Sequence, residues 1–210
     1  MKALTKEAQA KISPMGAVEI LKQGNERFMK NRKADRDLLE QVKDTATGQY
    51  PFATILSCID SRVSAELIFD QGVGDIFSVR VAGNIVNEDL LGSMEFACKL
   101  AGTKVVVVLG HTSCGAVKGA CDDAHLGNLT TLLSKIKPAV HAVAVPEDPA
   151  ERTSKNLDFV DQVAETNVRM TIENIRKQSP VLRIMEEDGE IALIGAMYDI
   201  STGKVDFMAP

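Results

Sequence analysis

Residues 104–110 read KVVVVLG, and this run of apolar residues decides the fold. Four consecutive valines leave no polar position for solvent, so a strand made of them must be covered on both faces, as the strands of a parallel sheet are. Three further runs rich in β-branched residues have the same character: FATILS at 52–57, DIFSVRVAG at 75–83 and EIALIGAM at 190–197. We therefore expect four buried strands.

Helical stretches alternate with these runs. The pattern of apolar residues and the turn residues at its ends predict helices at 65–70, 89–100, 129–145, 156–178 and 180–188. Strands that alternate with helices form open sheets with right-handed crossovers. The tail YDISTGKVDFM at 198–208 predicts a last strand, a turn and a short edge strand. The sequence thus predicts an α/β fold: an open, mainly parallel central sheet of four strands plus a C-terminal antiparallel edge strand, flanked by helices.

A further helix is expected before the first strand. The Ser-Pro pair at 13–14 suits an N-cap and a first helical position. The residues that follow place Val18, Leu21 and Phe28 on roughly one face. This region predicts an amphipathic helix whose apolar face packs on a protein surface.

Composition and charge limit the function classes. The chain has 210 residues, a net charge of −5 and a pI near 5.3, which argues against a nucleic-acid partner because phosphate contacts need clustered Lys and Arg. No apolar run approaches the ~20 residues that span a bilayer, so no membrane partner is expected. The N-terminus lacks the apolar core of a signal peptide, which makes a cytoplasmic location the expectation. We expect residues 1–210 to form a single domain, with 1–48 as a helical arm.

Two reactive clusters follow predicted strands directly. SCIDSR at 57–62 follows the first apolar run, and GHTSCG at 110–115 follows the valine run. Ligands of open α/β sheets gather at the carboxyl ends of the strands, so both clusters are expected at one edge of the sheet. In a reducing compartment, sulfurs and histidines that meet in this way more often indicate metal binding or catalysis than a disulfide scaffold.

Cys58, His111 and Cys114 together make a Cys2His set of ligands. Zinc favours this mixture of thiolate and imidazole, and three protein ligands leave its fourth tetrahedral position open for water or substrate. The flanking Gly110 and Gly115 are expected to permit a tight turn. These residues predict an open zinc site.

Asp60 and Arg62 stand beside the first cysteine. On an extended chain, residues two apart point the same way, so both side chains can face the site of Cys58. The carboxylate can occupy the fourth zinc position and close the site, or accept a hydrogen bond from the zinc-bound hydroxide. Arg62 favours the second arrangement because a guanidinium binds a carboxylate bidentately. A pair that only pins the loop is the remaining alternative.

The pairing of C-x-D-S-R with H-x-x-C resembles the β-class carbonic anhydrases. The resemblance extends over most of the chain, through LKQGNERF, GQYP, GDIFSVRVAGN, SMEFA and GAMYDISTGKV. It implies that Cys58, His111 and Cys114 are zinc ligands, with one Zn²⁺ per subunit, and that Asp60 and Arg62 form the catalytic dyad. Some members of the class close at low pH around a Trp–Arg–Tyr pocket. This chain has no Trp, so the resemblance is to the plant-like, open-site subtype.

The same resemblance assigns a substrate pocket. It implies that Gln49 and the backbone N–H of Gly115 bind substrate, and that Phe77, Ala82 and Phe96 line the pocket. Phe96 stands where plant-like members often have Tyr, and Ala82 where a larger aliphatic residue is common. For the two phenylalanines, packing in the core is the alternative, and for Gln49 a solvated turn.

The activity implied is the zinc-dependent, reversible hydration of CO2 to bicarbonate and a proton. Hydrolysis of COS or CS2 at the same zinc site is the nearest alternative, and a non-catalytic, zinc-stabilised α/β binding protein is a more distant one. The resemblance also implies a homodimer or homotetramer with the active site at the subunit interface, in which the arm at 1–48 packs on the partner subunit.

Overall fold

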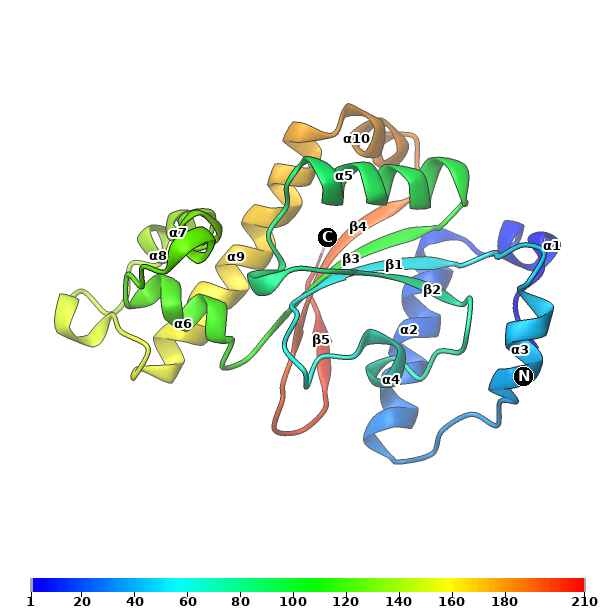
Figure 1. Cartoon of the computed structure of the whole chain (residues 1–210), viewed down its shortest axis with the longest axis horizontal. Helices are drawn as coiled ribbons and strands as arrows, with labels where there is room; N and C mark the ends of the chain where they lie inside the picture. The colour runs from blue at the N-terminus through cyan, green and yellow to red at the C-terminus, as the bar shows by residue number, and fades with distance from the viewer. Residues whose placement is uncertain (1, 210) are drawn as a thin grey trace.

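Five strands form one sheet at the centre of the computed structural model, which describes residues 2–209 (Figure 1). The strands are β1 (Ala53–Ser57), β2 (Ile76–Arg80), β3 (Val105–His111), β4 (Ala192–Tyr198) and β5 (Val205–Phe207). Their order is β2-β1-β3-β4-β5; the first four are parallel, and β5 pairs antiparallel with β4. This architecture confirms the predicted fold. The end residues of the predicted domain, 1 and 210, lie outside the described residues.

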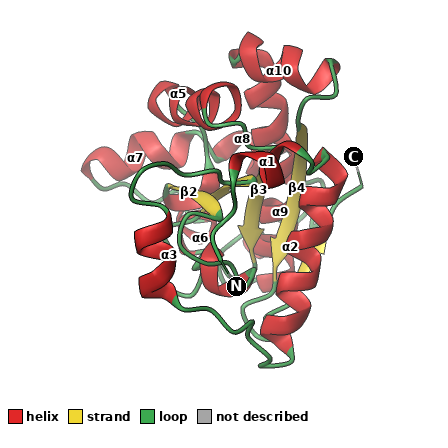
Figure 2. Cartoon of the chain, turned by 90° about the vertical axis from the view of Figure 1, so that its right-hand side faces the viewer, coloured by secondary structure: helices red, strands yellow, loops and turns green. Residues whose placement is uncertain are grey.

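Helices cover both faces of the sheet, as the view turned by 90° shows (Figure 2). They are α1 (Lys6–Ala10), α2 (Pro14–Met29), α3 (Leu38–Asp44), α4 (Ala65–Ile68), α5 (Glu88–Glu95), α6 (Gly115–Cys121), α7 (Gly127–Ser134), α8 (Lys137–Ala142), α9 (Leu157–Gln178) and α10 (Pro180–Glu187). Helices α2 and α4 pack on one face, and α5, α9 and α10 pack on the other. Within residues 2–209, no helix combines the length and the apolar character needed to cross a bilayer.

Strand β3 lies at the centre because it can be buried on both faces. All seven of its residues are buried. Val105, Val107 and Leu109 pack in the core beneath α2, while Val106 and Val108 pack in the core beneath α9 and α10. The unbroken valine run therefore serves two cores at once, as its lack of polar positions predicts.

Helix α2 has the predicted cap and the predicted apolar face. The Ser13 side chain accepts a hydrogen bond from the backbone N–H of Gly16, and Pro14 is the first helical residue. Val18 and Leu21 are buried against strands of the same chain. Helix α2 is thus part of its own subunit's core. Packing of the arm at 1–48 on a partner stays a proposal, for which the exposed Leu38, Leu39 and Val42 of α3 are available.

Two predicted helices differ in the structure. The prediction of one helix over 129–145 is wrong, because α7 ends at Ser134 and α8 starts at Lys137. Pro138 explains the break, since it lacks the N–H that a continuous helix would need and fits the first turn of a new one. The helix predicted at 89–100 is α5 followed by a π-helical turn, Phe96–Leu100, which ends before Gly102.

A buried ion cluster ties the segment between α2 and α3 to the end of α4. Asp70 is 6% exposed; its carboxylate accepts hydrogen bonds from Arg27, from Arg36 at 2.7 Å and from the backbone N–H of Ala34 at 3.1 Å. Burial by itself raises the pKa of Asp70, but the hydrogen bond from Arg27 and the other contacts outweigh it and the pKa lies below its usual value. The ionised Asp70 carboxylate therefore stabilises the fold fully above its unfolded-state pKa. This stabilisation is lost as the pH falls through the folded-state pKa.

Asp70→Asn should lower the free energy of unfolding by about 3 kcal/mol, because it leaves the buried Arg36 with only the longer, 4.0 Å contact to Asp75 as its counter-charge. Urea unfolding at pH 7 measures this. Asp206→Asn is the control, since the Lys204–Asp206 pair is exposed and such pairs contribute less than about 1 kcal/mol. Equal losses in the two variants would contradict the assigned role of Asp70.

Candidate metal centre

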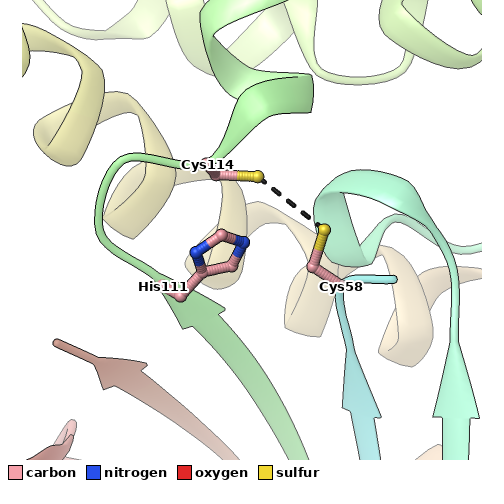
Figure 3. A group of neighbouring side chains, drawn as sticks. All are labelled: Cys58, His111 and Cys114. Atoms are coloured by element: carbon pink, nitrogen blue, oxygen red, sulfur yellow. Dashed lines mark hydrogen bonds between the residues drawn. The ribbon is translucent and has the colours of Figure 1, made fainter. Parts of the chain in front are cut away.

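The register of the sheet brings the two reactive clusters together. Strands β1 and β3 are parallel neighbours, and Ser57 pairs with Leu109, so Cys58 follows β1 at the edge where β3 ends in His111. Cys114 follows a short turn and is the N-cap residue of α6, as Figure 3 shows. One donor atom from each of Cys58, His111 and Cys114 lies within 4.8 Å of the others. The structure thus assembles the predicted ligand set from segments more than 50 residues apart.

The imidazole of His111 is oriented for a metal. Its Nδ1 lies 2.9 Å from the backbone carbonyl oxygen of Thr112, which can only accept a hydrogen bond, so Nδ1 donates. The opposite nitrogen, Nε2, then carries the lone pair; it is buried and has no hydrogen-bond partner among residues 2–209. A buried nitrogen without a partner is costly unless it binds something, and a metal ion between the two sulfurs fits it.

The two cysteines also fit a cation. Their sulfurs lie 3.9 Å apart and both side chains are buried. The hydrogen bond with Cys114 lowers the pKa of Cys58 to about 4, and the same hydrogen bond, with burial, raises the pKa of Cys114. Two buried thiolates this close repel each other, so without a cation the pair keeps a proton. A divalent ion compensates both charges and releases that proton.

The turn between His111 and Cys114 is set by Ser113. Its φ of 53° lies in the left-handed region, and its backbone N–H donates a hydrogen bond of 2.8 Å to the carboxylate of Asp161 on α9. The expected tight turn is present, but Gly110 serves packing instead: a Cβ there would lie 2.5 Å from Val168. The turn lies where the sequence predicts it, but the residue with a positive φ is Ser113 and not either of the flanking glycines, Gly110 and Gly115.

Asp60 and Arg62 form the predicted pair. The guanidinium donates from Nε to Oδ1 at 2.9 Å and from Nη2 to Oδ2 at 2.7 Å, and the backbone N–H of Arg62 donates to Oδ1 at 3.0 Å. The hydrogen bonds from Arg62 hold the pKa of Asp60 well below its usual range. Asp60 Oδ2 also lies 4.0 Å from His111 Nε2. The anionic carboxylate therefore lies beside the ligand set while bound by the guanidinium.

Arg80, which our sequence analysis missed, fixes the loop that carries Cys58 and Asp60. It extends from the end of β2 and donates to the carbonyl oxygens of Cys58, at 3.1 Å, and Asp60, at 2.8 Å. The signal for it was available, because Arg80 is a charged residue at the carboxyl end of a predicted strand, where site residues are expected.

A cavity of about 270 Å³ opens beside the ligand set. Its walls are mostly apolar, and its lining residues are Cys58, Ile59, Asp60, Ala82, Gly115, Ala116, Gly119, Leu129 and Leu133. Two of the predicted pocket residues, Ala82 and Gly115, thus lie at this cavity. Gly115 is the first residue of α6, where a backbone N–H has no partner inside the helix. Leu129 and Leu133 form the wall contributed by α7. The sequence predicts an apolar helix face there but does not indicate that this face lines the cavity.

The other three predicted pocket residues lie elsewhere on the chain. Phe77 pairs in register with Thr54, four positions before Cys58, so it is about 13 Å along the sheet from the ligand set. Phe77 and Phe96 have ring centroids 6.3 Å apart and line a separate hollow of about 730 Å³ on β2 and α5. Gln49 is exposed and precedes β1, at the opposite end of that strand from Cys58. Within one chain, the structure does not bring these residues to the metal centre.

The carbonic anhydrase family model matches residues 53–205, well over half of the chain. The chain belongs to the β-carbonic anhydrase family. The general reaction of this family is the hydration of CO2, and its members generally depend on zinc. The matched residues begin with β1 and end with the first residue of β5, so the match includes the whole metal centre.

Individual relatives support the assignment. Carbonic anhydrase 2 of Mycobacterium tuberculosis is 35% identical over 193 residues, which cover 91% of each chain. A β-carbonic anhydrase structure from Aspergillus fumigatus is 27% identical, covers 81% of each chain and superposes with a TM-score of 0.68. A β-carbonic anhydrase from Sordaria macrospora shares the fold, with a TM-score of 0.69 over 80% of this chain and 85% of that one at 24% identity.

Proposed function

We propose that this protein catalyses the reversible hydration of CO2 to bicarbonate and a proton, with one Zn²⁺ per subunit held by Cys58, His111 and Cys114. One observation carries the proposal. The three buried donor atoms, among them the unpartnered Nε2 of His111, lie beside an Arg62-bound Asp60 at the wall of an apolar cavity. When bound there, zinc would supply a water molecule with a lowered pKa at a fourth, open coordination position.

The roles of the protein residues follow from their positions. Asp60 stays anionic because of Arg62, and its carboxylate can accept a hydrogen bond from the attacking water and fix the direction of the lone pair. Gly115 lines the same cavity, and its backbone N–H, which has no partner within α6, can donate to a substrate oxygen as negative charge develops. The apolar wall at Ala82 and Leu133 suits CO2, which carries no charge for recognition.

We propose that the site is open. Three hydrogen bonds from Arg62 hold the carboxylate of Asp60, which would have to give them up to become a fourth metal ligand. Those hydrogen bonds favour the arrangement in which a solvent molecule occupies the fourth coordination position of the metal.

We propose a homodimer or homotetramer in which a partner subunit supplies Gln49, Phe77 and Phe96 to the cavity. The two phenylalanines line an exposed hollow at the sheet edge formed by β2, which has no neighbouring strand on its outer side within the described chain. The Sordaria macrospora relative of the same fold is described as tetrameric.

A cytoplasmic location suits the four cysteines, none of which forms a disulfide.

kcat/KM should rise between pH 6.5 and 9, by up to about tenfold per pH unit. Two thiolates and a neutral imidazole nearly cancel the charge of Zn²⁺, so the water bound there is less acidic than in a three-histidine site. Asp60 does not cause the rise, because its lowered pKa keeps it anionic over this whole range. Stopped-flow rates with zinc content held constant measure the profile. A flat profile would contradict the charge argument.

Parallel assays on CO2, COS and CS2, with zinc quantified on the same sample, test the proposed substrate. We expect CO2 hydration to be the fastest of the three by at least about 10²-fold, a difference of about 3 kcal/mol in activation free energy. Faster hydrolysis of COS or CS2 would make the protein a hydrolase with the same metal centre. A zinc-loaded protein that turns over none of them would be a zinc-stabilised binding protein.

A further inference from the structure

Helix α9 is hydrogen-bonded to the turn that carries two of the metal donors and to the turn at Ala82–Asn84, which contacts the third donor, Cys58. Near its start, the carboxylate of Asp161 accepts the backbone N–H of Ser113, in the turn between two of the donors, at 2.8 Å. Six residues further along, Asn167 donates from Nδ2 to the backbone carbonyl of Gly83, also at 2.8 Å. These two contacts are about 9 Å apart along the helix axis, so one rigid element holds both halves of the centre.

Gly83 connects Asn167 to the first cysteine. Its backbone N–H donates to Cys58 Sγ at 3.4 Å, while its carbonyl accepts the amide of Asn167. Gly83 has a φ of 69°, and a Cβ there would lie 2.5 Å from Ile136, so no other residue fits without strain. A glycine has no side chain to limit its rotation, so the bond from Asn167 holds the residue whose N–H points at the sulfur.

Asn167 has no role in the metal centre except through Gly83. It is 3% exposed, and its partner lies 84 residues away in the sequence. Removing its Nδ2 would leave the Gly83 carbonyl buried without a partner, and the loop would move to find one. Donors that hold metal ligands in this indirect way typically change metal affinity 10–100-fold when they are lost.

We propose that Asn167 and Asp161 are positioning residues, through which α9 sets the placement of Cys58 relative to the His111–Cys114 turn. The inference extends the proposed function, because it rests on the metal centre assigned there. Neither residue belongs to the set of metal donors, and neither lines the cavity beside it. Their effect is expected on metal affinity and on the geometry of the sulfur ligands.

Substitutions at Asn167 and Asp161, including the exchanges Asn167→Asp and Asp161→Asn, which keep the side-chain size nearly constant, test the proposal. Asn167→Asp keeps the shape but loses the donor, and should weaken Zn²⁺ and Co²⁺ binding about 10–100-fold. Asp161→Ala should weaken it in the same direction, and Asp161→Asn should recover most of the loss, because its amide oxygen still accepts the N–H of Ser113. Competition with a chromophoric chelator gives the affinities. The sulfur-to-cobalt charge-transfer band should shift in the Asn167 variant.

Controls separate positioning from general damage. Asn167→Ala repeats the test without a buried charge, and circular dichroism of the metal-free variants checks folding. Thr171→Val changes a buried polar residue one turn further along α9 that lines a different hollow, and should stay within about twofold of wild type. The proposal is overturned if Asn167→Ala and Asp161→Ala both bind metal within twofold of wild type, or if Thr171→Val loses as much. Because affinity is measured without turnover, the result stands whether or not the wild type hydrates CO2.

Discussion

Cys58→Ser should purify with less than about 0.1 zinc per chain and lose at least about 10³-fold in CO2 hydration. The serine keeps the size of the side chain but offers a hydroxyl in place of a thiolate, and the two remaining donors cannot compensate the ion. The metal-free protein should also unfold at a lower temperature, because metal binding stabilises only the folded chain. Zinc analysis and stopped-flow assays on the same sample measure both losses.

The two other cysteines provide matched controls. Cys98 is buried against Thr103, and burial raises its pKa to about 11; burial likewise raises the pKa of Cys121 to about 11. Neither belongs to the ligand set, so Cys98→Ser and Cys121→Ser should keep full zinc content. If either loses its zinc while Cys58→Ser retains it, the assignment of ligands is wrong.

Asp60→Asn should retain its zinc and lose about 10²–10³-fold in kcat/KM. The substitution keeps the shape and removes the anion that Arg62 stabilises. The amide also presents two donor hydrogens where the attacking water needs an acceptor. Metal content should not change, because Asp60 is hydrogen-bonded to Arg62 and does not belong to the Cys58–His111–Cys114 donor set.

Each other outcome for Asp60→Asn has a distinct meaning. Full activity at equal zinc content would reduce the Asp60–Arg62 pair to a loop contact. Loss of zinc together with activity would make Asp60 a metal ligand and the site closed. Asp123→Asn is the control, since this carboxylate also pairs with a cation, Lys137, but is exposed and lies outside the cavity.

The fold was predictable because its signals are local. Runs such as 104–110 can only be buried on both faces, and the strand-end rule then places Cys58 and His111 at one edge of the sheet. The break between α7 and α8 has a local signal as well, Pro138. The sequence analysis missed it because apolar residues continue through the predicted helix at 129–145.

The remaining parts of the site carry no local signal. The contact of Asn167 with Gly83 joins residues 84 positions apart, and neither its spacing nor its residue types distinguish it from other polar positions on a helix. Phe77 lies in an ordinary strand pattern, and its place in a hollow separate from the metal centre depends on the register between β1 and β2. Such features depend on the assembled chain.

X-ray absorption at the zinc edge of the purified protein tests the central claim most directly. We expect one zinc per chain with two sulfur ligands at about 2.3 Å, one imidazole nitrogen at about 2.0 Å and one further light atom from solvent. Fewer than two sulfurs in the first shell, a carboxylate from Asp60 in the fourth position at neutral pH, or purified wild-type protein that carries no zinc would contradict it.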